Sequence, residues 1–273
     1  MKSPEIIGMV HLMACPGAPL FGGNPDAVIE KALADADALV SGGIDAMLVE
    51  NAGDTPFLNH EIDYGTVAMV AVVARELRET FRIPVGIDIA TNGATAALAA
   101  AKAAGAEFIR ITGWCSTYIH STGIVTPCAA EALRYRRLIG GAEIRILADI
   151  EVKHASHQIT SDLSLEDRIR DAYTNGAEGI ILTGRQTGEK ANLSQVMAAK
   201  ETAPLPVYIG SGADRENIGE YLPYIDGAVV GTSLKTGGMI DRKKTEAFMA
   251  AVRGRAGFSR KPAAGEISGG PSL

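Results

Sequence analysis

Eight short apolar segments, each followed by a stretch with helical spacing of apolar residues, constrain the fold of this chain more than any other feature. The apolar segments predict strands. Stripes such as Val28, Ala32 and Ala36 predict the intervening helices, because residues three and four positions apart share one helix face. The predicted strands are Ile6–His11, Ala46–Asn51, Pro84–Ile89, Phe108–Thr112, Ile144–Ile150, Gly179–Gly184, Pro206–Gly212 and Ala228–Ser233.

Glycines mark the ends of several predicted helices directly before the next strand, as at Gly43, Gly105 and Gly176. Glycine suits the left-handed conformation that ends many helices. Repeated strand–helix units with short connections predict the α/β class and a closed, parallel eight-stranded (β/α)₈ TIM barrel, with an open doubly wound sheet as the alternative. We expect a single barrel domain over residues 1–255 and a flexible C-terminal tail, rich in Gly, Pro and Ser, over residues 256–273.

Two glycine-rich loops follow the last two predicted strands. Glycine lets backbone N–H groups approach an anion, and a Ser or Thr hydroxyl adds a donor. One such loop could equally be a tight turn, but in TIM barrels the loops after the seventh and eighth strands often form a phosphate site. We therefore predict phosphate binding by Gly210, Ser211, Gly212, Gly231, Thr232 and Ser233.

Polar residues end the earlier predicted strands, at the rim where barrel enzymes carry their chemistry. A ring of charged side chains there is hard to explain as packing, because buried charges cost free energy unless they are paired or used. The predicted catalytic residues are Lys153, Asp149, Glu151, Glu50 and Asp88. The predicted substrate-binding residues are His11, Asn51, Arg110, His154 and Thr183.

The densest of these groups is Asp149, Glu151 and Lys153, which strand alternation places on one face. Carboxylates beside a lysine hold its ammonium group and tune its proton affinity. Lys153 could then act as a proton shuttle or as a Schiff-base nucleophile. The alternative is a structural ion pair that closes the top of the barrel.

The sequence requires no cofactor, although a divalent metal ion is compatible with it. Nitrogen and oxygen ligands could come from His11, Glu50, Asp88, Glu151 and His154. Alternatively, these residues bind substrate hydroxyl groups directly. Trp114, the single tryptophan, falls in the long loop after the fourth predicted strand, where it could pack on a sugar or base ring.

Composition narrows the classes of partner. The net charge is −6 and no long basic run occurs, which argues against nucleic acid and against a polybasic membrane contact. No apolar run reaches the roughly 20 residues of a membrane helix, and the three cysteines lack CxxC spacing. We expect a cytoplasmic homo-oligomer that binds a phosphorylated small molecule, with no nucleic-acid partner and no membrane insertion.

Four stretches together resemble the BtpA/SgcQ family, in the family's order, over residues 5–253. They are Gly8-Met9-Val10-His11-Leu12, Val49-Glu50-Asn51-Ala52-Gly53-Asp54-Thr55-Pro56-Phe57, Ala148-Asp149-Ile150-Glu151-Val152-Lys153-His154-Ala155 and the final glycine-loop pair. The resemblance implies a phosphate-binding TIM barrel. It also implies kinship with a cyanobacterial branch linked to photosystem I accumulation, and with branches found where there is no photosynthesis. Positions typical of the family are Glu50, Asn51, Asp54, Asp149, Lys153 and His154.

The chain departs from the usual family pattern in three loops, where a substrate would be recognised. The departures are Leu12-Met13-Ala14-Cys15-Pro16-Gly17-Ala18-Pro19, Asp88-Ile89-Ala90-Thr91-Asn92-Gly93 and His120-Ser121-Thr122-Gly123.

The sequence supports two functional hypotheses. The first is an enzyme acting on a phosphorylated sugar or nucleotide-like molecule, by lyase, isomerase or glycosidic-cleavage chemistry. The alternative is a non-catalytic assembly or stability factor, of the kind proposed for photosystem I biogenesis.

Overall fold

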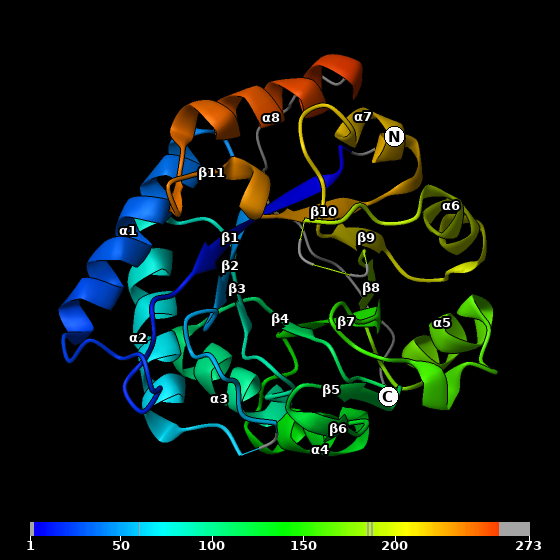
Figure 1. The fold of residues 1–273 in the computed structure, drawn as a ribbon, viewed down its shortest axis with the longest axis horizontal. Coiled ribbons are helices and arrows are strands. Elements are labelled where there is room, and N and C mark those ends of the chain that lie inside the picture. Colours follow the sequence, from blue (N-terminus) through cyan, green and yellow to red (C-terminus); the bar gives the residue numbers. More distant parts are fainter. Residues whose placement is uncertain (1–2, 60, 185, 187, 257–273) are drawn as a thin grey trace.

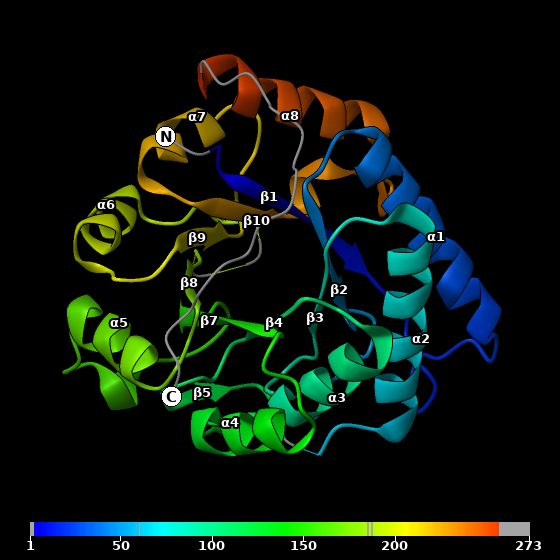
Figure 2. The ribbon, with the colours of Figure 1, turned by 180° about the vertical axis from the view of Figure 1, so that it is seen from behind.

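The computed structural model describes residues 3–59, 61–184, 186 and 188–256, and it forms a closed barrel of eight parallel strands inside a ring of helices (Figures 1 and 2). Around the barrel the order is β1-β10-β9-β8-β7-β4-β3-β2. The barrel strands are β1 (Glu5–His11), β2 (Ala46–Glu50), β3 (Val85–Asp88), β4 (Phe108–Ile111), β7 (Arg145–Glu151), β8 (Gly179–Leu182), β9 (Val207–Gly210) and β10 (Gly227–Val230). The TIM-barrel prediction is confirmed, and the open doubly wound sheet is excluded.

Each of the eight predicted strands overlaps an observed one, with boundaries that differ by a few residues. The largest difference is at the last strand, which ends at Val230 rather than Ser233. There the chain turns into a short 3-10 helix, η3 (Thr232–Leu234). The glycine loops therefore leave the barrel wall earlier than the apolar pattern predicts.

The outer layer consists of helices that alternate with the barrel strands. Their bounds are α1 (Pro25–Ser41), α2 (Tyr64–Phe81), α3 (Ala94–Ala104), α4 (Ala129–Leu138), α5 (Leu165–Thr174), α6 (Leu193–Thr202), α7 (Ile218–Tyr221) and α8 (Arg242–Ala256). Local signals set several ends: Asn24 caps α1 by accepting from two backbone N–H groups, and Gly105 ends α3 at φ +72°. Of the predicted tail, residues 257–273 lie outside the described residues.

Strand alternation divides the barrel interior into layers. Ile7 and Met9 of β1 face inward and pack with inward side chains of the other strands. His11 continues the same face at the end of the strand. The apolar interior is made of Ile7, Met9, Ala46, Leu48, Phe108, Leu147, Ile181, Tyr208 and Val229. The layer above it, at the carboxyl ends of the strands, is therefore the place for polar side chains.

Short elements that the apolar pattern did not predict decorate the loops. The loop after β4 contains a hairpin of β5 (Tyr118–His120) and β6 (Gly123–Val125), and a second small hairpin, β11 (Lys235–Thr236) with β12 (Met239–Ile240), precedes α8. Two further 3-10 turns are η1 (Gln158–Thr160) and η2 (Leu222–Tyr224).

Within the described residues, we find no helix with the length and apolar character needed to span a membrane.

The placement of the Trp114 side chain differs from the prediction. Its side chain is 1% exposed and belongs to the main hydrophobic core. It is therefore not available to stack on a sugar or base, and the prediction that it could do so is wrong. An indole in a barrel loop can face either the site or the layer between strands and helices, and the loop backbone, which the sequence does not specify, decides which.

Candidate active site

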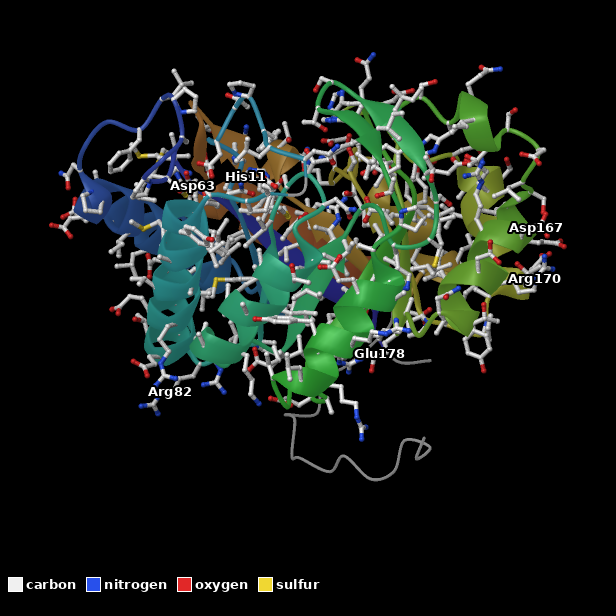
Figure 3. The ribbon with its side chains drawn as sticks, turned by 90° about the horizontal axis from the view of Figure 1, so that it is seen from below. His11, Asp63, Arg82, Asp167, Arg170 and Glu178 are labelled. Carbon is white, nitrogen blue, oxygen red and sulfur yellow. The ribbon has the colours of Figure 1, made fainter. Side chains whose placement is uncertain are left out.

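The inward-facing residues at the strand ends form one ring. In the strand register, His11 pairs with Glu50 and Glu50 pairs with Asp88, so three predicted site residues lie side by side across β1, β2 and β3. Figure 3 shows His11 and Asp63 in the upper half of the molecule, whereas Arg82 and Glu178 lie near its lower edge. Because Glu178 directly precedes β8, the side on which His11 lies is the carboxyl end of the barrel.

A cavity of about 200 Å³ opens at this end. Its wall combines the two glycine loops with charged side chains from the ends of other barrel strands. All six predicted phosphate-binding residues line it, together with His11, Glu50, Arg110 and Lys153. Its remaining lining residues are Met9, Gly188, Ala213, Asp214, Val229 and Val230. The structure therefore brings four of the ten predicted catalytic and substrate-binding residues and both glycine loops to a single space.

The first glycine loop passes close enough to the loop after β8 to require glycine at position 212. Gly212 has φ +65°, and a Cβ atom there would lie 2.2 Å from the carbonyl oxygen of Glu189. The Ser233 hydroxyl donates to the Ala213 carbonyl at 2.7 Å and so ties the two loops together. Among the described residues, none accepts a hydrogen bond from the backbone N–H groups of Gly212, Ala213, Thr232 or Ser233. Unpaired N–H groups beside a cavity are suitable donors for an anion.

Arg110 and Asp149 form a buried, bidentate ion pair across β4 and β7. The guanidinium Nε and NH2 atoms lie 2.9 and 2.8 Å from the two carboxylate oxygens, and NH1 lies 3.7 Å from Asp88. Burial disfavours the charge of Arg110, but Asp149 and Asp88 outweigh that effect and raise its pKa. A bidentate pair of this kind holds both side chains in one orientation.

The two carboxyl groups of Glu50 and Asp88 take different protonation states. Burial opposes the charge of Glu50, but its hydrogen bond to His11 and the neighbouring charges of Lys153 and Arg110 lower its pKa to about 2. Burial and the charge of Glu50 raise the pKa of Asp88 to about 8, against the effect of Arg110. At neutral pH, Glu50 is therefore ionised while Asp88 holds a proton. Separation of pKa values within a carboxyl pair is typical of acid–base sites.

His11 is held on both sides of its ring. Its Nε2 atom lies 3.2 Å from Glu50 Oε2, and its Nδ1 atom contacts the ammonium group of Lys235. The backbone carbonyl of His11 accepts from Lys31 at 2.7 Å. Because Lys235 can only donate, Nδ1 accepts and Nε2 carries the proton toward Glu50. Lys235 is not among the predicted site residues, because its position in a hairpin 224 residues from His11 leaves no local signal in the sequence.

The expected single face of Asp149, Glu151 and Lys153 does not form, and that interpretation is wrong. A register shift between Asp149 and Glu151 interrupts the β7–β8 ladder, and the strand ends at Glu151. Asp149 points to Arg110, and Lys153 lines the cavity, whereas Glu151 lines a different cavity beyond β7 and β8. A bulge adds one residue to the strand and so breaks the alternation.

The other predicted residues occupy three different surroundings. Asn51 is buried and bridges two loops: its Oδ1 accepts from the Ala90 N–H at 2.8 Å, and its Nδ2 donates to Asp54 at 3.1 Å. The Thr183 hydroxyl donates to the Glu151 carbonyl at 2.8 Å. His154, at φ +59°, lines the cavity beyond β7 and β8 with Thr183. Their predicted role in substrate binding stays a prediction.

The five residues considered as metal ligands do not form one cluster. His11 and Glu50 line the first cavity, whereas Glu151 and His154 line the other. Across the part of the chain that the structure describes, no group of three or more His, Cys, Asp or Glu side chains is arranged to hold a metal ion. A divalent metal stays a prediction from the sequence.

The raised pKa of Asp88 predicts a stability that falls with pH. The carboxyl binds its proton more tightly in the folded protein, with a pKa of about 8, than in the unfolded chain, with a pKa of 3.8. Its contribution is complete below the unfolded value and is lost as pH rises through the folded value. We expect the free energy of unfolding to fall by on the order of 4 kcal/mol between about pH 5 and 9, since about three pH units separate pH 5 from the folded pKa and each contributes about 1.4 kcal/mol. Urea unfolding across that range measures the fall.

The matched variants for this measurement are Asp88→Asn and Asp162→Asn. The amide of Asp88→Asn stays neutral, so it should flatten the pH dependence. Asp162 is exposed, and its replacement should leave the dependence as it is. An equal pH dependence in the wild-type protein and Asp88→Asn would contradict the assignment.

Structural comparison supports the fold class. The chain is similar to 3-hexulose-6-phosphate synthase from Salmonella typhimurium (TM-score 0.61, 12% identity, 92% of this chain and 99% of that chain). It is also similar to KGPDC from Streptococcus mutans (TM-score 0.60, 14% identity, 93% and 100%). A third match is N-(5'-phosphoribosyl)anthranilate isomerase from Pyrococcus furiosus (TM-score 0.58, 14% identity, 92% and 99%). At these identities the likeness concerns the barrel itself.

Sequence comparison is more specific. An uncharacterized protein of Archaeoglobus fulgidus is 41% identical over 249 residues, which cover 91% of this chain and 98% of that protein. The photosystem I biogenesis protein BtpA of Synechocystis is 37% identical over 273 residues, which cover 98% of this chain and 93% of that protein. The model of the BtpA family matches residues 2–254. The resemblance inferred from the motifs is thus confirmed, and the chain belongs to the BtpA family.

Proposed function

We propose that this protein is an enzyme that transfers a proton on a phosphorylated sugar or nucleotide-like molecule, in a lyase, isomerase or glycosidic-cleavage reaction. One observation carries the proposal: two loops with unpaired backbone N–H groups share a small cavity with Glu50, His11, Arg110 and Lys153. An anchor for an anion and ionisable side chains within one space are what such a reaction needs. The structural relatives named for phosphorylated compounds, such as 3-hexulose-6-phosphate, support the same substrate class.

Each part of the cavity has a role in this proposal. The N–H groups of the two glycine loops bind the phosphate, and Lys153 donates or withdraws the proton at the reacting atom. Glu50, ionised and oriented by His11, stabilises positive charge on Lys153 or on the substrate. Asp88, protonated and adjacent to Glu50 in the register, supplies a reserve proton. The ion pair of Arg110 with Asp149 keeps this wall of the cavity rigid.

The alternative hypothesis, a non-catalytic assembly factor, does not explain this arrangement. The relative from Synechocystis is named for photosystem I biogenesis, and that role belongs to that protein. A scaffold gains nothing from ionisable groups that converge on a cavity, because their desolvation costs free energy. Homo-oligomeric assembly and a cytoplasmic location stay predictions from the sequence.

Phosphate binding is testable with a matched pair of variants at Thr232, which lines the cavity but is exposed. Thr232→Glu places a carboxylate beside the unpaired N–H groups, and we expect it to weaken binding of inorganic phosphate at least tenfold, about 1.4 kcal/mol. Thr232→Gln has the same size without the charge and should change the affinity by less than about threefold. Calorimetric titration with phosphate at constant ionic strength measures both.

The result can contradict the proposal in two ways. Equal affinities of Thr232→Glu and Thr232→Gln would mean that phosphate binds elsewhere. A complete lack of stabilisation by phosphate or by phosphorylated sugars would remove the anion site, because a ligand at 100 times its Kd should stabilise the folded protein by about 2.7 kcal/mol.

A further inference from the structure

A second cavity, of about 1100 Å³, lies beyond the carboxyl ends of β7 and β8. It adjoins the first cavity through two chain segments. Val152 and His154 line the second cavity whereas Lys153, between them, lines the first. In the loop after β8, Glu189 lines the second cavity and its neighbour Gly188 lines the first. The two spaces therefore share walls at the proposed catalytic lysine.

Arg168 is the most informative residue of this second cavity. It lies in the first turns of α5, lines the cavity and is only 5% exposed. Its guanidinium donates to the Thr160 carbonyl at 2.7 Å and to the Thr160 hydroxyl at 3.4 Å. Among the described residues, no carboxylate lies within ion-pair distance of Arg168, although a buried charge without a counter-ion is costly. The other buried or half-buried arginines of the described residues, such as Arg110 and Arg136, each lie within ion-pair distance of a carboxylate.

His157 gives an independent indication. It lines the same cavity, and its Nδ1 atom is buried without a hydrogen-bond partner. Its Nε2 atom lies 3.1 Å from the N–H of Val152, which can only donate, and 3.2 Å from the carbonyl of the same residue. Nε2 therefore faces both polar groups of Val152, and Nδ1 is the ring nitrogen left for another partner; it donates when it carries the ring proton. A buried ring nitrogen with no partner among the described residues indicates a missing hydrogen-bonding group.

Other lining residues of the same cavity can accept hydrogen bonds from hydroxyl groups. Among the described residues, the Glu151 carboxylate receives one long side-chain hydrogen bond, from Gln195 Nε2 at 3.4 Å, and Thr183 also lines the cavity. Glu189 and Lys190 complete the charged groups of the lining. A lining that combines such donors with such acceptors suits a molecule that carries both an acidic group and hydroxyl groups.

We propose that this second cavity is an anion-binding site, in which Arg168 and His157 hold a carboxylate or phosphate group of a hydroxylated molecule. The inference rests on the proposed function in one respect: the second cavity adjoins Lys153, the proposed catalytic residue. The anionic group belongs to the far end of the same substrate, whose phosphate occupies the glycine loops, or to a second reactant. In the first case the substrate carries two acidic groups, and in the second each of two reactants carries one. Either case differs from a reaction on a single sugar monophosphate.

Titration of the full-length, ¹⁵N-labelled protein with inorganic phosphate tests this site. We expect two separate groups of backbone amide signals to shift, one around Gly212 and Ser233 and the other around Gln158 and Arg168. Arg168→Met should weaken the second response at least tenfold and leave the first unchanged. Arg170→Met, on the same helix but with an exposed side chain paired with Asp167, is the matched control and should alter neither.

The variants separate this inference from the proposed function. Thr232→Glu should abolish only the first response, and its failure to do so would count against the proposed function alone. A second response that is absent in the wild-type protein, or that survives in Arg168→Met, overturns the second site. If Arg168→Met does not fold, Lys190→Glu provides the same test at an exposed position, again with a loss of about tenfold expected. Malonate in place of phosphate shows whether the site prefers carboxylates; binding of neither anion overturns it.

Discussion

Replacement of Arg110 by methionine is expected to lower the free energy of unfolding by about 3–5 kcal/mol, since it leaves Asp149 without its partner in the barrel interior. Arg110 is 4% exposed, and Asp149 receives both of its carboxylate hydrogen bonds from it. An ionised carboxylate without a counter-ion in this surrounding is strongly disfavoured. Urea unfolding at neutral pH measures the loss, which is expected to exceed that of any single surface substitution.

Two further variants show whether the loss comes from the unpaired charge. Arg145→Met removes a cation that is 40% exposed and 3.6 Å from Glu5, and it should cost no more than about 1 kcal/mol. The double variant Arg110→Met with Asp149→Leu removes both charges and should recover most of the lost stability. If the double variant is less stable than Arg110→Met alone, the unpaired charge is not the cause.

The second large effect is expected on catalysis. Replacement of Lys153 by methionine should lower the rate of proton transfer by about 10²- to 10⁴-fold, because it removes the group that exchanges the proton while keeping a side chain of similar length. The rate can be followed by NMR as incorporation of deuterium from D₂O into a panel of phosphorylated aldoses, ketoses and nucleotides. This readout detects proton transfer at carbon before the complete reaction is known.

The controls for Lys153 separate chemistry from folding. Lys153 lies after the end of β7 and is only partly buried, so Lys153→Met should unfold at nearly the same urea concentration as the wild-type protein. Lys243→Met, an exposed lysine of α8, should leave exchange unchanged. Borohydride treatment with a keto or aldehyde phosphate tests the Schiff-base alternative, which requires a covalent adduct on Lys153. Exchange that proceeds equally in Lys153→Met would exclude this lysine as the proton-transfer group.

Short-range patterns account for most of the fold. The eight apolar segments predict the eight barrel strands, because alternation and helical spacing depend only on neighbours along the chain. Gly105 and Gly176 predict helix ends correctly for the same reason, as both adopt a positive φ. The hairpin of β5 and β6 was missed, since its three-residue strands are too short to show a period.

The candidate site depends on contacts that no local pattern contains. Local patterns along the chain predict which residues end the barrel strands, and hence that His11, Glu50 and Asp88 stand in one ring with two glycine loops nearby. Three features appear only once the barrel has closed: a bulge after Asp149 sends Glu151 and Lys153 to different cavities, Lys235 contacts His11, and Arg168 is buried with no carboxylate within ion-pair distance among the described residues. The two kinds of feature differ in range, because alternation is set by adjacent backbone units, whereas charge pairing and burial are set by segments that are far apart in the sequence.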